Sequence, residues 1–367
     1  MTNRQDSDKP AGVASSRRIF IAGAAAAAVG APAALAAGRV FAFPRAAIDA
    51  QGLPICSVAA DGPAPAAGPL KKITFAWNAG APCLVAVTVA KDKGFFARHG
   101  LDVDLINYSG STDQLLETLA TGKADAAIGM ALRWLKPLEQ GFDVKIIAST
   151  HGGCLRLLVP ADSGLGDLKD LKGKTIAVSD MNAPGKNFFA IALKRAGLDP
   201  VADVDFKPFP GPLLRAAVEK GEAHAIADTD PNTFLWLKDG KFKEISSNLS
   251  GDYAQRACCI VGVRGGLVRD DRPTAAAIAR ALLEAADFAH AHPSEAAATY
   301  LPFAPGSVSL DDLTTLAKYH THQHHPVGQA LKDQLASYAE ELKLVSVFKP
   351  TTDTAKYAAR IYADVLS

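Results

Sequence analysis

The sequence predicts an α/β protein of two similar lobes, each a mixed or parallel sheet flanked by helices, with a C-terminal helical tail. Short strand patterns alternate with helical patterns from Lys72 to about Ala227, as in βαβ units. A similar segment occurs twice, at 121–127 and 220–226, and each copy is a helix end, a glycine turn and a strand edge. After about Ala257, one strand pattern is followed only by helical patterns, which indicates the tail.

The elements follow in order from their apolar spacing. Strands are predicted at 73–77, 101–106, 124–128, 144–148, 155–159, 175–178, 204–206, 223–227 and 258–263. Helices are predicted at 83–98, 111–122, 130–139, 185–196, 211–220, 231–238, 272–291, 294–300, 310–323 and 327–343. Ser111 followed by Gln114 has the pattern of a capping box. We expect the tail helices to pack back on the first lobe.

Composition limits the function. The chain has 367 residues, of which 49% are hydrophobic, and its 39 Lys+Arg against 38 Asp+Glu give a net charge of +1. This length suits two domains with a large core. The near-neutral charge argues against a nucleic-acid-binding protein, which usually carries a strong basic excess. Five cysteines in a chain this long exclude a disulfide-built scaffold, and their odd number leaves at least one unpaired within the chain.

Residues 1–36 have the layout of a cleaved export signal. Arg17 and Arg18 precede an alanine-rich apolar run that ends in small residues. The arginine pair followed by Phe20 resembles a twin-arginine signal, whose carrier exports folded proteins. A permanent N-terminal anchor is the alternative, and the weakly apolar run favours cleavage.

Residues 37–70 are rich in Ala, Pro and Gly, a composition typical of a linker. We expect the first lobe to comprise residues 71–152 and 255–367, and the second lobe residues 153–254.

Four motifs resemble those of periplasmic solute-binding proteins. Lys91–Phe96 with His99–Val103 resembles the signature A-x-x-x-G-F-F-x-x-x-G-L-x-V, and Leu168–Val178 resembles the second-lobe entry D-L-K-G-K-x-I-A-V. The Ala124–Ala126 and Asp230-Pro231 segments fit as well. The most similar group is the nitrate/sulfonate/taurine and pyrimidine-precursor binding proteins of ABC importers, which includes the NMT1/THI5-like proteins.

The resemblance covers roughly residues 72–300 and implies a type II periplasmic-binding-protein fold. A ligand would lie between the lobes, against loops at the carboxyl ends of the strands, and a hinge motion would close around it. The implied function is that of a periplasmic component of an ABC import system that captures a small polar organic or oxyanion-type solute. Its partners would be permease and ATPase subunits. We expect a monomer with no cofactor, no catalytic residue, no metal and no nucleic-acid partner.

Candidate ligand contacts lie at predicted strand ends and helix starts. They are Trp77, Asn78, Ser109, Gly110, Ser111, Met130, His151, Asp180, Met181, Asn182, Asp228 and Asp230. Several have a structural alternative: Trp77 could be a core residue, Ser111 a helix cap and His151 a hinge histidine. For Cys154 we favour buried packing over a nucleophile, because the sequence places no general base beside it.

The carboxylates bear on the ligand class. Two aspartates near one pocket disfavour a sulfonate or nitrate and favour an amine, an aminopyrimidine or another donor-rich ligand. Asp230 could cap the 231–238 helix, so we expect Asp228 rather than Asp230 to contact the ligand. Asp180, at the start of the second-lobe helix, would occupy the place of a bound anion.

A histidine-rich run spans His320–His325. Its residues His320 and His324 have the i, i+4 spacing that can chelate zinc or copper on one helix face. The run contains no Asp or Glu and falls in the tail, so we expect solvated histidines.

An enzyme on the same fold is the alternative function. Pyrimidine-precursor synthases of the THI5 group resemble this family and carry a cysteine-rich stretch and a pyridoxal-phosphate lysine. This chain has only a short counterpart to these features: the pair Cys258-Cys259, and Lys186 without a supporting motif. No hydrolase motif is present, so we expect a binding protein and no enzyme.

Overall fold

The computed structural model describes residues 68–367 except 109–111. The chain divides into two units, Met1–Ala60 and Asp61–Ser367, and the described residues belong to the second. The predicted export signal, most of the predicted linker and the candidates Ser109, Gly110 and Ser111 lie outside the described residues. Among those described, no helix combines the length and the apolar character needed to cross a membrane.

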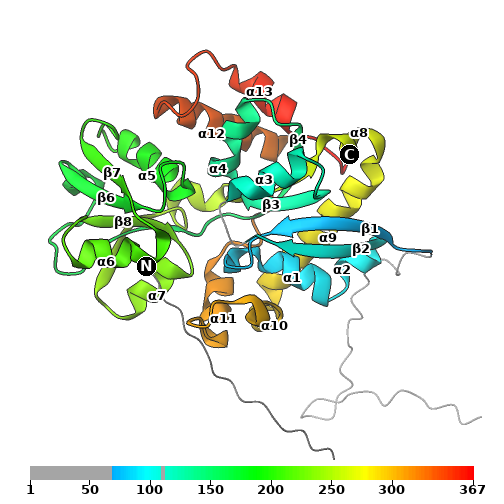
Figure 1. Ribbon diagram of the computed structural model, residues 1–367, viewed down its shortest axis with the longest axis horizontal. Helices are drawn as coiled ribbons and strands as arrows, with labels where there is room; N and C mark the ends of the chain where they lie inside the picture. The colour runs from blue at the N-terminus through cyan, green and yellow to red at the C-terminus, as the bar shows by residue number, and fades with distance from the viewer. Residues whose placement is uncertain (1–67, 109–111) are drawn as a thin grey trace, which may run out of the picture. The chain divides into compact units, whose positions relative to one another are not determined.

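Two mixed sheets flanked by helices form the framework, as predicted, and each has five strands (Figure 1). The first has the order β2-β1-β3-β10-β4, from β1 (Lys71–Trp77), β2 (Leu101–Asn107), β3 (Ala126–Met130), β4 (Val144–His151) and β10 (Cys259–Arg264). The second has the order β7-β6-β8-β5-β9, from β5 (Leu155–Pro160), β6 (Lys174–Val178), β7 (Val204–Pro208), β8 (Ala225–Thr229) and β9 (Phe242–Ser247). In each sheet a single strand, β10 or β5, runs antiparallel to both of its neighbours.

Helices cover both sheets. Around the first sheet lie α1 (Val85–Asp92), α2 (Phe95–Arg98), α3 (Thr112–Ala120), α4 (Ala131–Glu139), α8 (Gly265–Asp270), α9 (Arg272–Ala291) and α10 (Pro293–Tyr300). Around the second lie α5 (Pro184–Arg195), α6 (Leu214–Glu219) and α7 (Asn232–Lys238). The tail consists of α11 (Leu310–Tyr319), α12 (Gly328–Leu344) and α13 (Thr354–Ile361). Short 3₁₀ turns lie at Pro82–Leu84, Leu168–Leu171, Gly211–Leu213, Gly251–Gln255 and Leu301–Phe303.

Two helix predictions were too long. The single helix predicted over 83–98 is divided at Gly94, whose φ of 73° is left-handed and interrupts regular α-helix. The helix predicted over 310–323 ends at Tyr319, because His320 adopts an extended conformation at its C-cap. The start of that helix follows its sequence signal, since Ser309 and Asp312 form a capping box.

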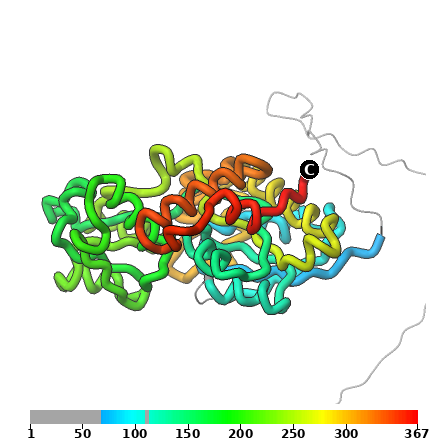
Figure 2. Tube along the Cα trace, turned by 90° about the horizontal axis from the view of Figure 1, so that it is seen from above, coloured from blue at the N-terminus to red at the C-terminus, as the bar shows by residue number. Residues whose placement is uncertain are grey.

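The tail does not pack on the first lobe alone, contrary to expectation. Helix α13 packs beside β4, and Tyr362 forms an isolated bridge with Ile146. Helix α12 instead packs against α5 of the second lobe, where the buried Glu341 accepts hydrogen bonds from Arg195 and Arg256. Figure 2 shows this C-terminal segment running over both halves. The tail therefore joins the lobes along one side.

Candidate functional site

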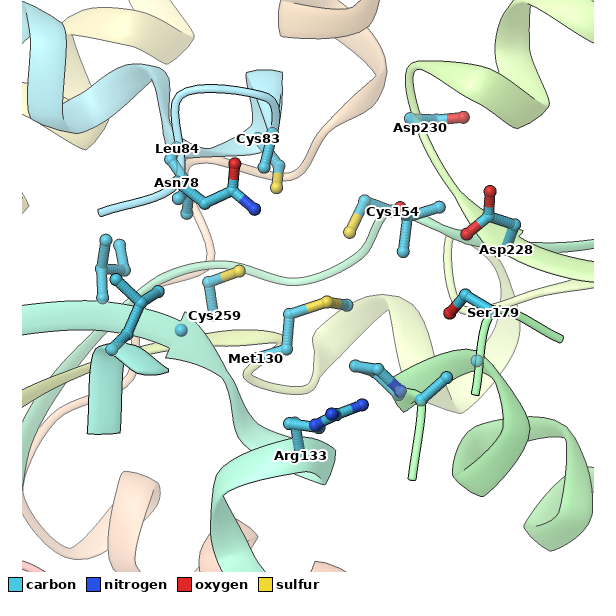
Figure 3. Close-up of a pocket in the computed structure, with 18 of the residues that line it drawn as sticks. Asn78, Cys83, Leu84, Met130, Arg133, Cys154, Ser179, Asp228, Asp230 and Cys259 are labelled. Atoms are coloured by element: carbon cyan, nitrogen blue, oxygen red, sulfur yellow. The ribbon is translucent and has the colours of Figure 1, made fainter. Parts of the chain in front are cut away.

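A cavity lies between the two sheets, at the ends of strands β1, β3, β6 and β8 (Figure 3). Its volume is about 200 Å³. Its lining is mostly apolar with a few polar groups, as in small-molecule sites. The lining residues are Asn78, Ala81, Cys83, Leu84, Leu115, Ile128, Gly129, Met130, Arg133, Cys154, Ser179, Asp180, Ala183, Pro184, Gly185, Ala227, Asp228, Thr229, Asp230 and Cys259.

On the first-lobe side, the loop after β1 presents Asn78 to the cavity. Its Oδ1 accepts a hydrogen bond from the amide of Gly80 at 2.8 Å. Its amide nitrogen has no protein partner in the described part of the chain, so Asn78 offers a donor to a ligand.

Trp77, one residue earlier, does not line the cavity. Its side chain is 1% exposed and packs edge-on against Tyr300 and Phe303, with ring centroids 6.2 and 5.1 Å away. The structure therefore gives Trp77 the core position that was the alternative to stacking on a ligand. Met181 and Asn182 are likewise outside the lining, on an exposed turn before α5.

Arg133, at the start of α4, connects the two walls of the cleft. Its Nε and one terminal nitrogen donate to the carboxylate of Asp113 at 2.8 and 2.6 Å. The other terminal nitrogen donates to both oxygens of Asp180, on the second-lobe side, at 2.7 and 2.8 Å. Burial opposes the charge, yet these two carboxylates raise the pKa of Arg133 above its ordinary value. The guanidinium is thus already neutralised by protein carboxylates.

Helix α5 begins at the cavity without a capping side chain. Its N-cap is Ala183, and Gly185 lies so close to β8 that an added Cβ would be 3.1 Å from the carbonyl oxygen of Ala227. Asp180, expected to occupy the place of an anion here, instead accepts from Arg133 and from the backbone of Asn182. No side chain of the described residues caps this turn, so its backbone amides after Pro184 can donate to an oxygen acceptor.

Asp228, at the end of β8, turns its carboxylate toward the cavity (Figure 3). It accepts one side-chain hydrogen bond, from Asn232 at 3.1 Å. Burial raises the pKa of Asp228 to about 6, and the nearby charge of Asp230 adds to the rise. A half-buried carboxylate with so few protein partners favours a ligand that brings a donor or a positive charge.

Asp230 is 1% exposed and is fully engaged by protein groups. Its carboxylate accepts from Arg156 Nε at 3.0 Å, from the hydroxyl of Thr233 at 2.6 Å and from the backbone of Phe234 at 3.1 Å. His320 Nε2 lies 3.1 Å from its other oxygen. Burial opposes ionisation, but His320 and Arg156 together lower the pKa of Asp230.

The histidine-rich run was expected to be solvated, and this prediction was wrong for His320 and His322. His320 and His322 are 1% and 0% exposed, and both lie beyond the end of α11. Their rings surround His151, which is also 0% exposed and does not line the cavity, at centroid distances of 5.9 Å each. These histidines are therefore buried at the crossing between the lobes.

Four cysteines meet beside His151. Cys83, Cys154, Cys258 and Cys259 are buried with free thiols, and three of them, all except Cys258, line the cavity. The Sγ atoms of Cys154 and Cys258 are 3.8 Å apart. The neighbouring thiols of Cys154 and Cys259 lower the pKa of Cys83 and of Cys258. The same contacts, with burial, raise the pKa of Cys154 and Cys259.

Comparison with known proteins identifies the family. The family model described as "NMT1/THI5 like" matches residues 82–296, more than half of the chain. The chain belongs to the NMT1/THI5-like family. This confirms the resemblance that the sequence motifs predicted. No curated protein matches the sequence.

Solved structures similar to this NMT1/THI5-like chain share its fold at low identity. The aliphatic sulphonate binding protein SsuA of Escherichia coli gives a TM-score of 0.68 at 15% identity, over 80% of this chain and 92% of that one. The nitrate-binding protein NrtA of Synechocystis PCC 6803 gives 0.66 at 16% identity, over 83% and 88%. SsuA of Xanthomonas axonopodis pv. citri bound to MOPS gives 0.64 at 17% identity, over 79% and 99%. The fold is therefore the predicted periplasmic-binding-protein fold.

Several lining residues of this NMT1/THI5-like chain were missed by sequence reasoning. Arg133 lies in the first turn after β3, so the rule that ligands bind beyond strand ends could have included it. Cys83 lies in the short 3₁₀ turn after β1, and its sequence neighbours carry no signal of a site. Lys186, weighed as a cofactor lysine, is not among the lining residues, and its Nζ lies 5.8 Å from the ring of Phe206.

Proposed function

We propose that this protein is the extracytoplasmic solute-binding component of an ABC import system, exported by the twin-arginine route and docking as a monomer on its permease. The observation that carries the proposal is the cavity between the two sheets, lined from both lobes at their strand ends. The fold supports it, since periplasmic sulphonate- and nitrate-binding proteins and a ligand-binding component of an ABC-type import system share it.

The charges of the cavity support a small solute rich in hydrogen-bond donors, such as an amine or an aminopyrimidine. Arg133 is its one lining cation among the described residues, and it is engaged by two aspartates. An anionic solute would have to displace one of these carboxylates to pair with Arg133, whereas a donor-bearing solute meets Asp228 directly. Asn78 and Asp228 are the residues we assign to polar contact, with Met130 as apolar lining.

The test is to identify a bound solute and follow its fate. Mass spectrometry of the denatured, purified protein should reveal a co-purifying small molecule, and adding it back should raise the Tm by mass action. A panel of amines, pyrimidines, taurine, sulfonates and nitrate covers the case in which nothing co-purifies. The solute should be recovered unchanged after incubation. A new product would instead favour an enzyme, and no stabilisation by any member would contradict solute capture.

A further inference from the structure

We propose that Cys83, Cys154, Cys258 and Cys259, with His151, form a binding site for one thiophilic metal ion, Zn²⁺ or Cu⁺, at the floor of the cavity. These residues come from three separate parts of the chain: the turn after β1, the crossing from β4 to β5, and the start of β10. Each is at most 5% exposed. Packing alone does not require these five side chains to lie together, because small apolar residues could fill the same buried space.

The four thiols, which we call the thiol ring, each lie within 4.8 Å of a ring nitrogen of His151. The sulfur of Cys83 lies within the same limit of that of Cys154, and the sulfur of Cys258 within the same limit of that of Cys259. The Sγ atoms of Cys154 and Cys258 are 3.8 Å apart. Ligands about 2.3 Å from a tetrahedral metal are separated by about 3.8 Å, so this edge of the ring already has the spacing of a zinc–thiolate site.

His151 adds a nitrogen within reach of both halves of the ring. One of its ring nitrogens lies within 4.8 Å of the sulfurs of Cys83 and Cys154, and the same limit holds for His151, Cys258 and Cys259. Two groups of three donor atoms thus share His151, and the Cys154–Cys258 contact joins them. Tetrahedral zinc sites use four such donors, commonly four cysteines or three cysteines and one histidine.

Unpaired buried nitrogens beside the ring point independently to a missing partner. His151 Nε2 has no hydrogen-bond partner among the described residues, while its Nδ1 accepts from the amide of Gly153 at 3.2 Å. The adjacent His320 Nδ1 and both ring nitrogens of His322 are also without one. Buried polar atoms are rarely left unpaired, and a group of them indicates a bound ion or water.

The donor set selects the kind of metal. Thiolates favour Zn²⁺ and Cu⁺, whereas Ca²⁺ and Mg²⁺ need oxygen ligands, which this set lacks. Thiols in mutual contact leave no room for the iron and sulfide atoms of a cluster. A disulfide between Cys154 and Cys258 would require about 2 Å between their sulfurs, so the observed 3.8 Å describes reduced thiols. Asn248 donates to the sulfur of Cys258 at 3.6 Å, a contact typical of the groups that support metal thiolates.

The experiment measures metal uptake by the full chain without any solute. Protein purified anaerobically under reducing conditions is stripped with a chelator, given Zn²⁺ or Cu⁺ in separate arms, desalted and analysed by inductively coupled plasma mass spectrometry. Co²⁺ serves as a spectroscopic probe, because thiolate ligation produces charge-transfer absorption. The double variant Cys154→Ser/Cys258→Ser removes two ring members, and Cys56→Ser, which lies outside the described residues, is the matched control.

We expect one ion per chain, with thiolate charge transfer, in the wild type and in Cys56→Ser, and affinity at least about tenfold weaker in the double variant. The Tm of the stripped wild type should rise on adding the metal, which keeps the test valid if the double variant does not fold. Uptake by the folded wild type no greater than by the double variant would overturn the proposal. So would a Cys154–Cys258 disulfide that persists under these reducing conditions. Neither result bears on solute capture, because no arm contains a solute.

Discussion

Asp228 and Asp230 lie two residues apart at the end of β8, and the protein uses them in opposite ways. Asp228 faces the cavity with one side-chain partner, and burial raises its pKa to about 6. Asp230 is enclosed by Arg156, Thr233 and His320, and its pKa is lowered. The difference shows that partners, rather than burial alone, decide whether a buried carboxylate holds the structure together or remains available to a ligand.

The largest expected effect is that of Asp230→Ala on stability. The change leaves the buried Arg156 with Glu244 as its remaining partner and removes the acceptor of His320. We expect the free energy of unfolding to fall by about 3 kcal/mol, as for other buried ion pairs that lose one partner. Urea denaturation measures this change. Asp230→Asn should lose less stability than Asp230→Ala, because the amide oxygen of Asn still accepts a hydrogen bond from Thr233. A loss below about 1 kcal/mol in Asp230→Ala would mean that the network contributes little.

Asp228→Ala should have the opposite profile. Its carboxylate supports no network, so the Tm of the solute-free protein should change by no more than a few degrees, while stabilisation by the bound solute disappears. Differential scanning calorimetry with and without the co-purifying solute measures both. Asp205→Ala, an exposed aspartate on β7, is the matched control and should keep solute binding. A collapse of the solute-free Asp228→Ala protein would make Asp228 structural.

The framework of the molecule could be predicted from sequence because strands with alternating or continuous apolar residues are recognisable. β9 was missed, since Phe242 and Ile245 are three residues apart and give no alternation. The helix predicted to 323 failed at His320, where no glycine or proline marked the end.

The site was only partly predictable. Asn78 and Asp228 follow from the rule that ligands meet strand ends. The thiol ring could not be foreseen, because it depends on β10 inserting antiparallel between β3 and β4, which sets Cys259 opposite both Met130 and His151. Nothing local to these residues encodes that pairing.

The titration of Asp228 has a smaller effect, on how the free energy of unfolding changes with pH, and the sign of this effect follows from the pKa shift. Its folded pKa of about 6 lies above the unfolded value of about 3.9, so the protonated form is favoured by folding. The stability it contributes is complete below pH 4 and is lost as the pH rises through 6. Because Asp228 is only half-buried, we expect a loss of about 1–2 kcal/mol relative to Asp228→Asn between pH 4 and 7. Parallel urea titrations of the two proteins measure it, and equal pH profiles would show that the carboxyl is well solvated.

The smallest expected effect concerns the ion pair across the cleft. Arg133 and Asp180 come from different lobes, so the pair favours the closed arrangement, but Asp180 is 43% exposed and water screens the attraction. Asp180→Asn should therefore lower stability by less than about 1 kcal/mol and raise the solute dissociation rate by up to about fivefold. Asp143→Asn is the matched control, because Asp143 pairs with Arg269 within the first lobe and should leave the rate unchanged. Stopped-flow release of the co-purifying solute measures both rates. If the two variants release solute equally fast, the Arg133–Asp180 pair contributes no more to closure than a surface ion pair does.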